Sequence, residues 1–153
     1  MLRTETVEPV TLELLKSLMQ KNYLKQFVLV GGTALALQLG HRFSVDLDFF
    51  TIEDFNTEVL MPQLLEDYRV TPSLQLPQTL ICEIDNIKVD FIRFKYGFIH
   101  PIKEIDGIRM LSIEDIAPMK LDAINGREAR KIFLTFIFCY NNSPSLSFLS
   151  SIN

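Results

Sequence analysis

Hydrophobic and polar residues alternate along this chain with two different periods, which predict helices in some segments and strands in others. Apolar residues three and four positions apart predict amphipathic helices over residues 11–24 and 55–68, the second one disturbed by Pro62. Short apolar runs at residues 27–30 and 45–50 are typical of buried strands. The first half of the chain is therefore predicted to alternate between helix and strand.

Glycines mark the ends of two of these elements. Gly31 and Gly32 directly follow the first strand and predict a tight turn into a short helix over residues 33–39. Gly40 then suits the left-handed residue that commonly closes a helix. A strand, a glycine turn and a short helix are thus expected in immediate succession.

A hairpin is predicted in the middle of the chain. Asp85 and Asn86 separate two apolar runs, at residues 79–84 and 87–94, and this pair is typical of a two-residue turn between strands. The preceding segment, residues 70–78, contains two prolines and is predicted to be a loop or an edge strand.

The last patterned region is predicted to be mainly helical. Residues 109–111 suggest one more short strand, and Ser112 begins a capping box for a short helical turn. Pro118 suits the first position of the next helix, which is expected to run to about residue 131. The order of elements predicts an α/β fold of the mixed α+β kind, a small mixed sheet flanked by helices.

Composition and charge narrow the class of protein. A chain of 153 residues, 48% of them hydrophobic and twelve of them Phe, has enough apolar surface for one ordinary domain. The net charge of -4 gives no support to broad, non-specific binding of nucleic acid. Two cysteines, no secretory signal and no apolar stretch long enough for a bilayer predict a reduced, cytoplasmic protein without membrane contact.

Two aspartates in the predicted strand at 45–50 are the strongest chemical signal. A period of two places Asp46 and Asp48 on the same face of that strand. Neighbouring carboxylates resist ionising together, and a hard divalent cation, Mg²⁺ or Mn²⁺, removes this cost. Asp90 alternates with apolar residues in the strand at 87–94 and would join the two if the strands are adjacent. We predict Asp46 and Asp48 as metal ligands, and Asp90 either as a further metal ligand or as the acceptor of the proton from the attacking hydroxyl. The alternative is a sheet face with solvated acids.

The glycine turn predicts a binding site for phosphate. Gly31 and Gly32 allow the backbone to approach an anion, the helix that follows supplies free N–H groups, and Thr33 adds a hydroxyl. Arg42, just before the aspartates, is a candidate contact for the same phosphates. An ordinary strand-to-helix turn is the alternative interpretation, and neither the Walker A pattern nor GxGxxG is present.

A stripe of cations is predicted on the later helix. Lys120, Arg127 and Lys131 are spaced so that they share one helical face. Lys120 and Arg127 are therefore candidates for contact with a triphosphate or a nucleic-acid backbone, and a solvated basic face is the alternative.

Several of these residues together resemble a known family. The run LVGGTALALQLGHRFSVDLDFF at residues 29–50 resembles the signature of the AbiEii/AbiGii-type nucleotidyltransferase toxins. VDFIRF at 89–94 resembles the strand with the third carboxylate, and SIEDIAPMKLDAINGREARK at 112–131 resembles the later motif with a functional lysine. The resemblance spans roughly residues 25 to 131.

This resemblance implies a polymerase-beta-like nucleotidyltransferase fold and transfer of a nucleoside monophosphate from an NTP, with Mg²⁺ or Mn²⁺ and release of pyrophosphate. It also implies the 3′ end of tRNA as acceptor and a cognate antitoxin as partner in a toxin–antitoxin or abortive-infection system. The implied roles are triphosphate binding by Gly32 and Thr33, metal binding by Asp46, Asp48 and Asp90, and charge neutralisation by Lys120.

The end of the chain departs from the family pattern. After Lys131 the family continues with acidic, helical sequence, whereas this chain continues with a Phe- and Ser-rich tail at 132–153 that looks truncated or frame-shifted. We predict a nucleotidyltransferase core at 1–131 and no separate domain in the tail. Nucleotidylation of a small molecule or a protein hydroxyl, and an inactive remnant that only binds NTP, stay open as alternatives.

Overall fold

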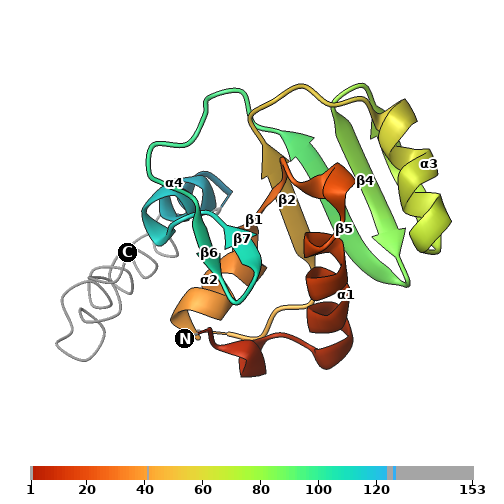
Figure 1. Cartoon of the computed structure of the whole chain (residues 1–153). Coiled ribbons are helices and arrows are strands. Elements are labelled where there is room, and N and C mark those ends of the chain that lie inside the picture. The colour runs from red at the N-terminus through yellow and green to blue at the C-terminus, as the bar shows by residue number, and fades with distance from the viewer. Residues whose placement is uncertain (1, 41, 124–125, 127–153) are drawn as a thin grey trace, which may run out of the picture.

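The computed structural model describes residues 2–40, 42–123 and 126 and contains a seven-stranded mixed sheet (Figure 1). The strands are β1 (Val28–Val30), β2 (Leu47–Thr51), β3 (Val70–Leu76), β4 (Thr79–Ile84), β5 (Ile87–Arg93), β6 (Lys103–Ile105) and β7 (Ile108–Met110). The helices are α1 (Pro9–Met19), α2 (Gly31–Leu39), α3 (Thr57–Asp67) and α4 (Ile113–Ala123), with short 3₁₀ turns η1 (Thr4–Thr6) and η2 (Asn22–Leu24). In this part of the chain no helix is long and apolar enough to cross a membrane.

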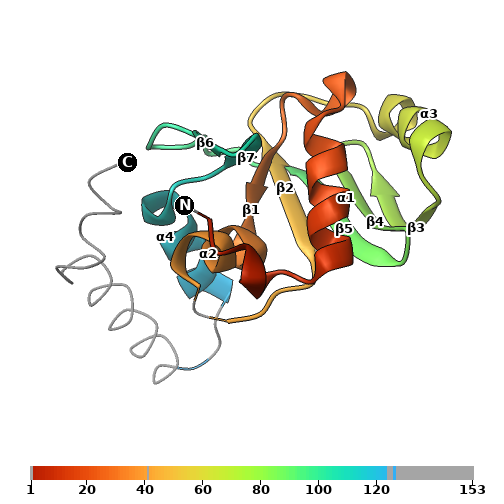
Figure 2. The ribbon, with the colours of Figure 1, turned by 60° about the horizontal axis from the view of Figure 1, so that its bottom comes forward.

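The order of the strands brings distant segments together. It is β3-β4-β5-β2-β1-β7-β6, so β2 lies between β1 and β5. β2 is antiparallel to β1 and parallel to β5, while β3-β4-β5 form an antiparallel meander. Figure 2 shows α1 and α3 over the half of the sheet that contains β2, β5 and β4, and α2 beside α4 near β1. The fold class predicted from the sequence, a mixed sheet flanked by helices, is confirmed.

The main core lies between the sheet and α1 and α3. Alternate residues of β2 and β5 point into it, and Phe49 and Phe91 stack there with ring centroids 5.3 Å apart. Phe27 meets Phe91 edge to face at 5.2 Å and Phe55, just before α3, at 5.0 Å. The side chains between these positions, including Asp48 and Asp90, therefore belong to the opposite face of the sheet.

Turns and caps form largely where the sequence predicts them. Gly40 ends α2 in the left-handed conformation, with φ 69°. Asp85 and Asn86 both have positive φ, 51° and 69°, as a two-residue hairpin turn of type I′ requires. β3 occupies the edge of the sheet with nearly all of its residues exposed, in agreement with the edge-strand alternative for 70–78.

Some element boundaries differ from the prediction. The prediction that Pro118 begins a helix is wrong, because α4 already begins at Ile113 and includes Pro118. Pro62 likewise lies inside α3, on its exposed side, where the carbonyl that loses its N–H partner can be hydrated. The helix predicted over 11–24 is split into α1 and η2, and the strand predicted over 45–50 begins only at Leu47, so Asp46 precedes it.

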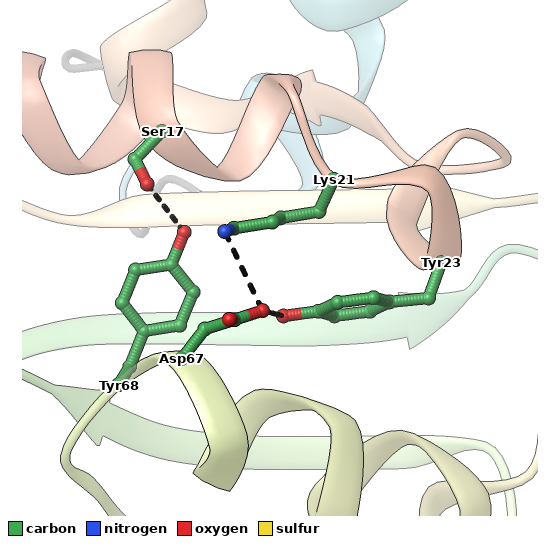
Figure 3. Close-up of polar contacts among 5 residues, drawn as sticks. All are labelled: Ser17, Lys21, Tyr23, Asp67 and Tyr68. Carbon is green, nitrogen blue, oxygen red and sulfur yellow. Dashed lines mark hydrogen bonds and ion pairs between the residues drawn. The ribbon is translucent and has the colours of Figure 1, made fainter.

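A polar network fixes α1 and η2 to the C-terminal end of α3 (Figure 3). The Ser17 and Tyr68 hydroxyl oxygens lie 2.5 Å apart, and Tyr23 donates to Asp67 Oδ2 at 2.8 Å. Lys21 Nζ lies 3.4 Å from the same carboxylate oxygen and 5.5 Å from the centre of the Tyr68 ring. Burial and the Asp67 carboxylate raise the pKa of Tyr23, so this phenol remains a donor. The network therefore links α1 to α3, the two helices that cover the core face of the sheet.

Candidate active site

Asp48 and Asp90 are direct register partners on neighbouring parallel strands. Because paired residues project to the same side of a sheet, their carboxylates share the face opposite the main core. Asp90 is buried, with only 8% of its surface exposed, and its Oδ1 atom is buried without a hydrogen-bond partner among the described residues. Its Oδ2 atom lies 3.7 Å from Nζ of Lys88, which sequence reasoning missed although it lies two residues earlier on the same strand face.

The two carboxylates disturb each other's ionisation. Burial, followed by the charge of Asp90, raises the pKa of Asp48 to about 6. Burial also raises the pKa of Asp90, against the opposing effect of Lys88. A hard divalent cation would coordinate the buried carboxylate oxygen that has no donor. Its charge would also offset the repulsion between the two carboxylates, so these residues fit Mg²⁺ or Mn²⁺.

Asp46 lies next to this pair but outside the strand. Its side chain is exposed, and its charge adds to the rise in pKa of both Asp48 and Asp90. As arranged in the described residues, no three His, Cys, Asp or Glu side chains form a group that could hold a metal ion. The structure thus brings Asp48 and Asp90 together directly, and the role of Asp46 as a third ligand stays a prediction.

The glycine turn packs against Asp48. Gly31 has φ 71°, in the left-handed region, and a Cβ atom there would lie 2.5 Å from Oδ2 of Asp48. Val30, the residue before α2, supplies no side-chain cap, so the N–H groups of the first turn are left for other partners. Glycine at position 31 is therefore required both by the backbone conformation and by the carboxylate that fills the space of a side chain.

Arg42 lies against the other glycine of the turn. A Cβ atom at Gly32 would meet Nη2 of Arg42 at 2.5 Å and would lie 3.8 Å from Oγ of Ser44. The first turn of α2 is thus flanked by a carboxylate on one side and a guanidinium on the other. This arrangement supports the prediction that Arg42 and the α2 N-terminus can contact the same phosphates.

Thr33 has a different environment from the one its predicted role suggests. It is 1% exposed, its hydroxyl oxygen lies 2.7 Å from that of Ser44, and the hydroxyl donates to the backbone carbonyl of Asp46. The hydroxyl is therefore used inside the protein, where it ties α2 to the segment that carries Asp46. Its backbone N–H, on the first turn of α2, remains the candidate phosphate contact.

The remaining predicted residues lie at or beyond the limits of the described structure. Lys120 belongs to α4, which packs against α2, but the position of its side chain is outside what the structure describes. Arg127, Lys131 and the tail at 132–153 lie outside the described residues altogether. Their roles stay predictions from the sequence.

Comparison with known proteins places the chain in a family. The profile described as "Nucleotidyl transferase AbiEii toxin, Type IV TA system" matches residues 13–106, more than half of the chain. An uncharacterized protein of Aquifex aeolicus (strain VF5) is 37% identical over 130 residues, which are 82% of this chain and 63% of that protein. The chain therefore spans less than two thirds of that relative's length.

Solved structures share the fold at low sequence identity. The crystal structure of JHP933 from Helicobacter pylori is 21% identical with a TM-score of 0.55, over 90% of this chain and 68% of the other. The structure of ANT(2″)-Ia in complex with adenylyl-2″-tobramycin is 17% identical with a TM-score of 0.50, over 94% of this chain and 95% of the other. At these identities the likeness shows the fold.

Proposed function

This chain belongs to the AbiEii nucleotidyltransferase toxin family, and we propose that it transfers a nucleoside monophosphate from an NTP to an acceptor hydroxyl, with the 3′ end of tRNA as the acceptor. The observation that carries the proposal is the packing of the Gly31 turn on Asp48, which is itself paired with Asp90. A helix end that suits a phosphate and two carboxylates that suit a divalent cation therefore lie close together, which supports the proposal.

In the proposed reaction, one group of residues binds the phosphates of the NTP and another binds the cation. The first-turn N–H groups of α2 and the Arg42 guanidinium hold the β- and γ-phosphates. Asp48 and Asp90, with Asp46, would hold the cation, and a bound Mg²⁺ or Mn²⁺ would supply charge neutralisation. The acceptor oxygen forms a bond to the α-phosphorus, the bond to the bridging oxygen breaks, and pyrophosphate leaves.

Asp90 takes the proton of the acceptor hydroxyl in this scheme. The carboxylate suits this role by its position, because Asp90 is the direct register partner of Asp48. Lys120 and Arg127 complete the neutralisation of the phosphates. The family description further supports a role as the toxin of a type IV toxin–antitoxin pair, with a cognate antitoxin as partner. We propose the cytoplasm as the place where this pair acts.

The proposal is tested by incubating the protein with each labelled NTP, Mg²⁺ and total tRNA. Label should be transferred by the wild type and lost in Asp48→Asn and Asp90→Asn. Glu83→Gln is the matched control, because Glu83 is an exposed carboxylate on the same sheet face, opposite Lys88 in the neighbouring strand. Equal labelling by all four proteins would show that the carboxylate pair is not the catalytic site.

A small-molecule hydroxyl is the second candidate acceptor. It is favoured by the match to ANT(2″)-Ia, which covers nearly the whole of both chains and whose structure contains an adenylylated aminoglycoside. The same assay with tobramycin in place of tRNA separates the two candidates, because the label then moves to a small product rather than to RNA.

A further inference from the structure

A second aromatic cluster lies on the same face of the sheet as the carboxylates. Phe50 follows Asp48 by two residues on β2, so strand alternation places it on the carboxylate face. Phe94, the first residue after the end of β5, stacks its ring on that of Phe50. This face differs from the core face, where Phe49 and Phe91 are buried completely.

The rings of this cluster are stacked in series. Phe50 and Phe94 have centroids 5.3 Å apart at an interplanar angle of 9°, and Phe94 and Phe98 have centroids 6.0 Å apart at 14°. Tyr96 meets Phe94 edge to face at 5.6 Å. We call Phe50, Phe94, Tyr96 and Phe98 the aromatic platform.

The platform is accessible, unlike the core aromatics. Its three phenylalanines are only half-buried, and Tyr96 is 88% exposed. An exposed tyrosine on a half-exposed stack leaves ring surface in water that a planar partner would cover. Lys95 is exposed between Phe94 and Tyr96 in sequence, so a cation accompanies the rings.

The platform and the glycine turn lie on opposite sides of Asp48. Val30, the last residue of β1, pairs with Asp48, so the Gly31 turn continues toward the Leu47 end of β2. Phe50 lies in the other direction, roughly 7 Å along the strand from Asp48. In an in-line displacement the attacking and leaving oxygens are on opposite sides of the phosphorus. If pyrophosphate leaves on the glycine side, the acceptor approaches from the side of the platform.

We propose that the aromatic platform binds the unpaired end of an RNA acceptor by stacking its bases, with Lys95 near the RNA backbone. This inference rests on the nucleotidyltransferase function proposed above and assigns the acceptor side of that site. Stacked aromatic residues next to cations are the usual means of binding single-stranded nucleic acid, and they tolerate any base. Base-paired RNA offers no free base faces and is bound weakly at such a surface.

The test measures RNA binding without NTP, in the Asp48→Asn background so that no transfer occurs. The probe is a fluorescein-labelled RNA with the sequence of the unpaired tRNA 3′ end, alone or annealed to its complement. The single strand should bind more tightly than the duplex, and Tyr96→Ala should raise its Kd roughly five- to hundredfold, the effect of losing one stacked base. Tyr96→Phe should restore the affinity.

Ile99→Ala is the matched control. Ile99 lies in the same segment and is also 88% exposed, but it cannot stack on a base, so its loss should leave the Kd nearly unchanged. Because both side chains are exposed, neither change should affect folding. The RNA affinity of Phe94→Leu is measured as a second variant within the stack. The unfolding midpoint of this variant is recorded in parallel to check that it is folded.

The outcomes separate this inference from the proposed function. Equal Kd values for Tyr96→Ala and Ile99→Ala, or equal binding of single strand and duplex, would overturn the platform. Self-association that disappears in Tyr96→Ala, without RNA binding, would also overturn it and assign the surface to a second copy. If RNA binds as expected but the wild type transfers no label from any NTP, the platform stands and the proposed enzymatic function fails.

Discussion

Replacement of Gly31 by alanine tests the contact on which the proposed site depends. Alanine at φ 71° is strained by the backbone alone, at a cost of about 1–2 kcal/mol. Its Cβ atom would also lie 2.5 Å from Oδ2 of Asp48, which forces the carboxylate out of its rotamer at a further cost of about 0.5–1.5 kcal/mol. We therefore expect Gly31→Ala to lower the free energy of unfolding by about 2–3 kcal/mol.

Gly107→Ala separates the two costs. Gly107 has φ 80°, but a Cβ atom there meets no atom of the described part of the chain within 4 Å, so this variant carries only the backbone cost of about 1–2 kcal/mol. Both variants are compared with the wild type by urea denaturation and by the rate of label transfer. Displacement of the carboxylate by about 1 Å should slow transfer by Gly31→Ala on the order of a hundredfold, while Gly107→Ala should retain the wild-type rate.

A double variant isolates the clash itself. Asp48→Ala removes the carboxylate and leaves its Cβ atom 3.3 Å from the new methyl group, a contact that small shifts can relieve. In this background Gly31→Ala should cost no more stability than Gly107→Ala. If Gly31→Ala and Gly107→Ala instead lose equal stability in the wild-type background and transfer label equally fast, the turn does not position Asp48.

Three further predictions concern stability and reactivity. Because the pKa of Asp48 is raised to about 6 in the folded protein, its contribution to stability is present at pH 4 and lost as the pH rises through 6. The free energy of unfolding of Asp48→Asn, relative to that of the wild type, should accordingly increase on the order of 2–3 kcal/mol from pH 4 to pH 8, as measured by urea titration in the presence of a chelator. The same difference between the two proteins at both pH values would contradict this. Burial raises the pKa of Cys82 to about 12, so in Cys139→Ser the remaining thiol should react with a thiol reagent at pH 8 only on unfolding. Asp67→Ala removes the acceptor shared by Tyr23 and Lys21 and should cost about 1 kcal/mol in thermal denaturation, whereas the exposed neighbouring Glu66→Ala should cost less than about 0.5 kcal/mol.

Local features of the fold were predictable because they depend on residues close in sequence. The Asp85-Asn86 turn and the glycine at the end of α2 follow from backbone preferences that each residue carries with it. The strand β6 was missed because three residues with only one apolar side chain show no period. Pro118 was wrongly predicted to begin a helix because proline is common at the first helical position. In the structure the helix has already begun at Ile113.

The candidate site was predictable only in part. Residue types and spacing indicated Asp48 and Asp90, but their pairing depends on the order of the strands, which no local pattern determines. The internal use of the Thr33 hydroxyl and the approach of Arg42 to Gly32 depend on a loop that returns to α2. The aromatic platform was missed because Phe49 and Phe50 form one apolar pair in sequence, and only the twofold strand period separates a core residue from a surface residue.

The parallel pairing of β2 with β5 has a consequence for the timing of activity. The hairpin β4–β5 can form by itself from neighbouring residues, but Asp90 meets Asp48 only when that hairpin joins the β1–β2 pair. Such non-local pairing is among the later events of folding, since a long loop must close before the contacts form. A nascent or partly unfolded chain therefore has separate carboxylates and lacks the proposed catalytic pair. Activity should appear and disappear with the global folding transition, without a partially folded form that is active.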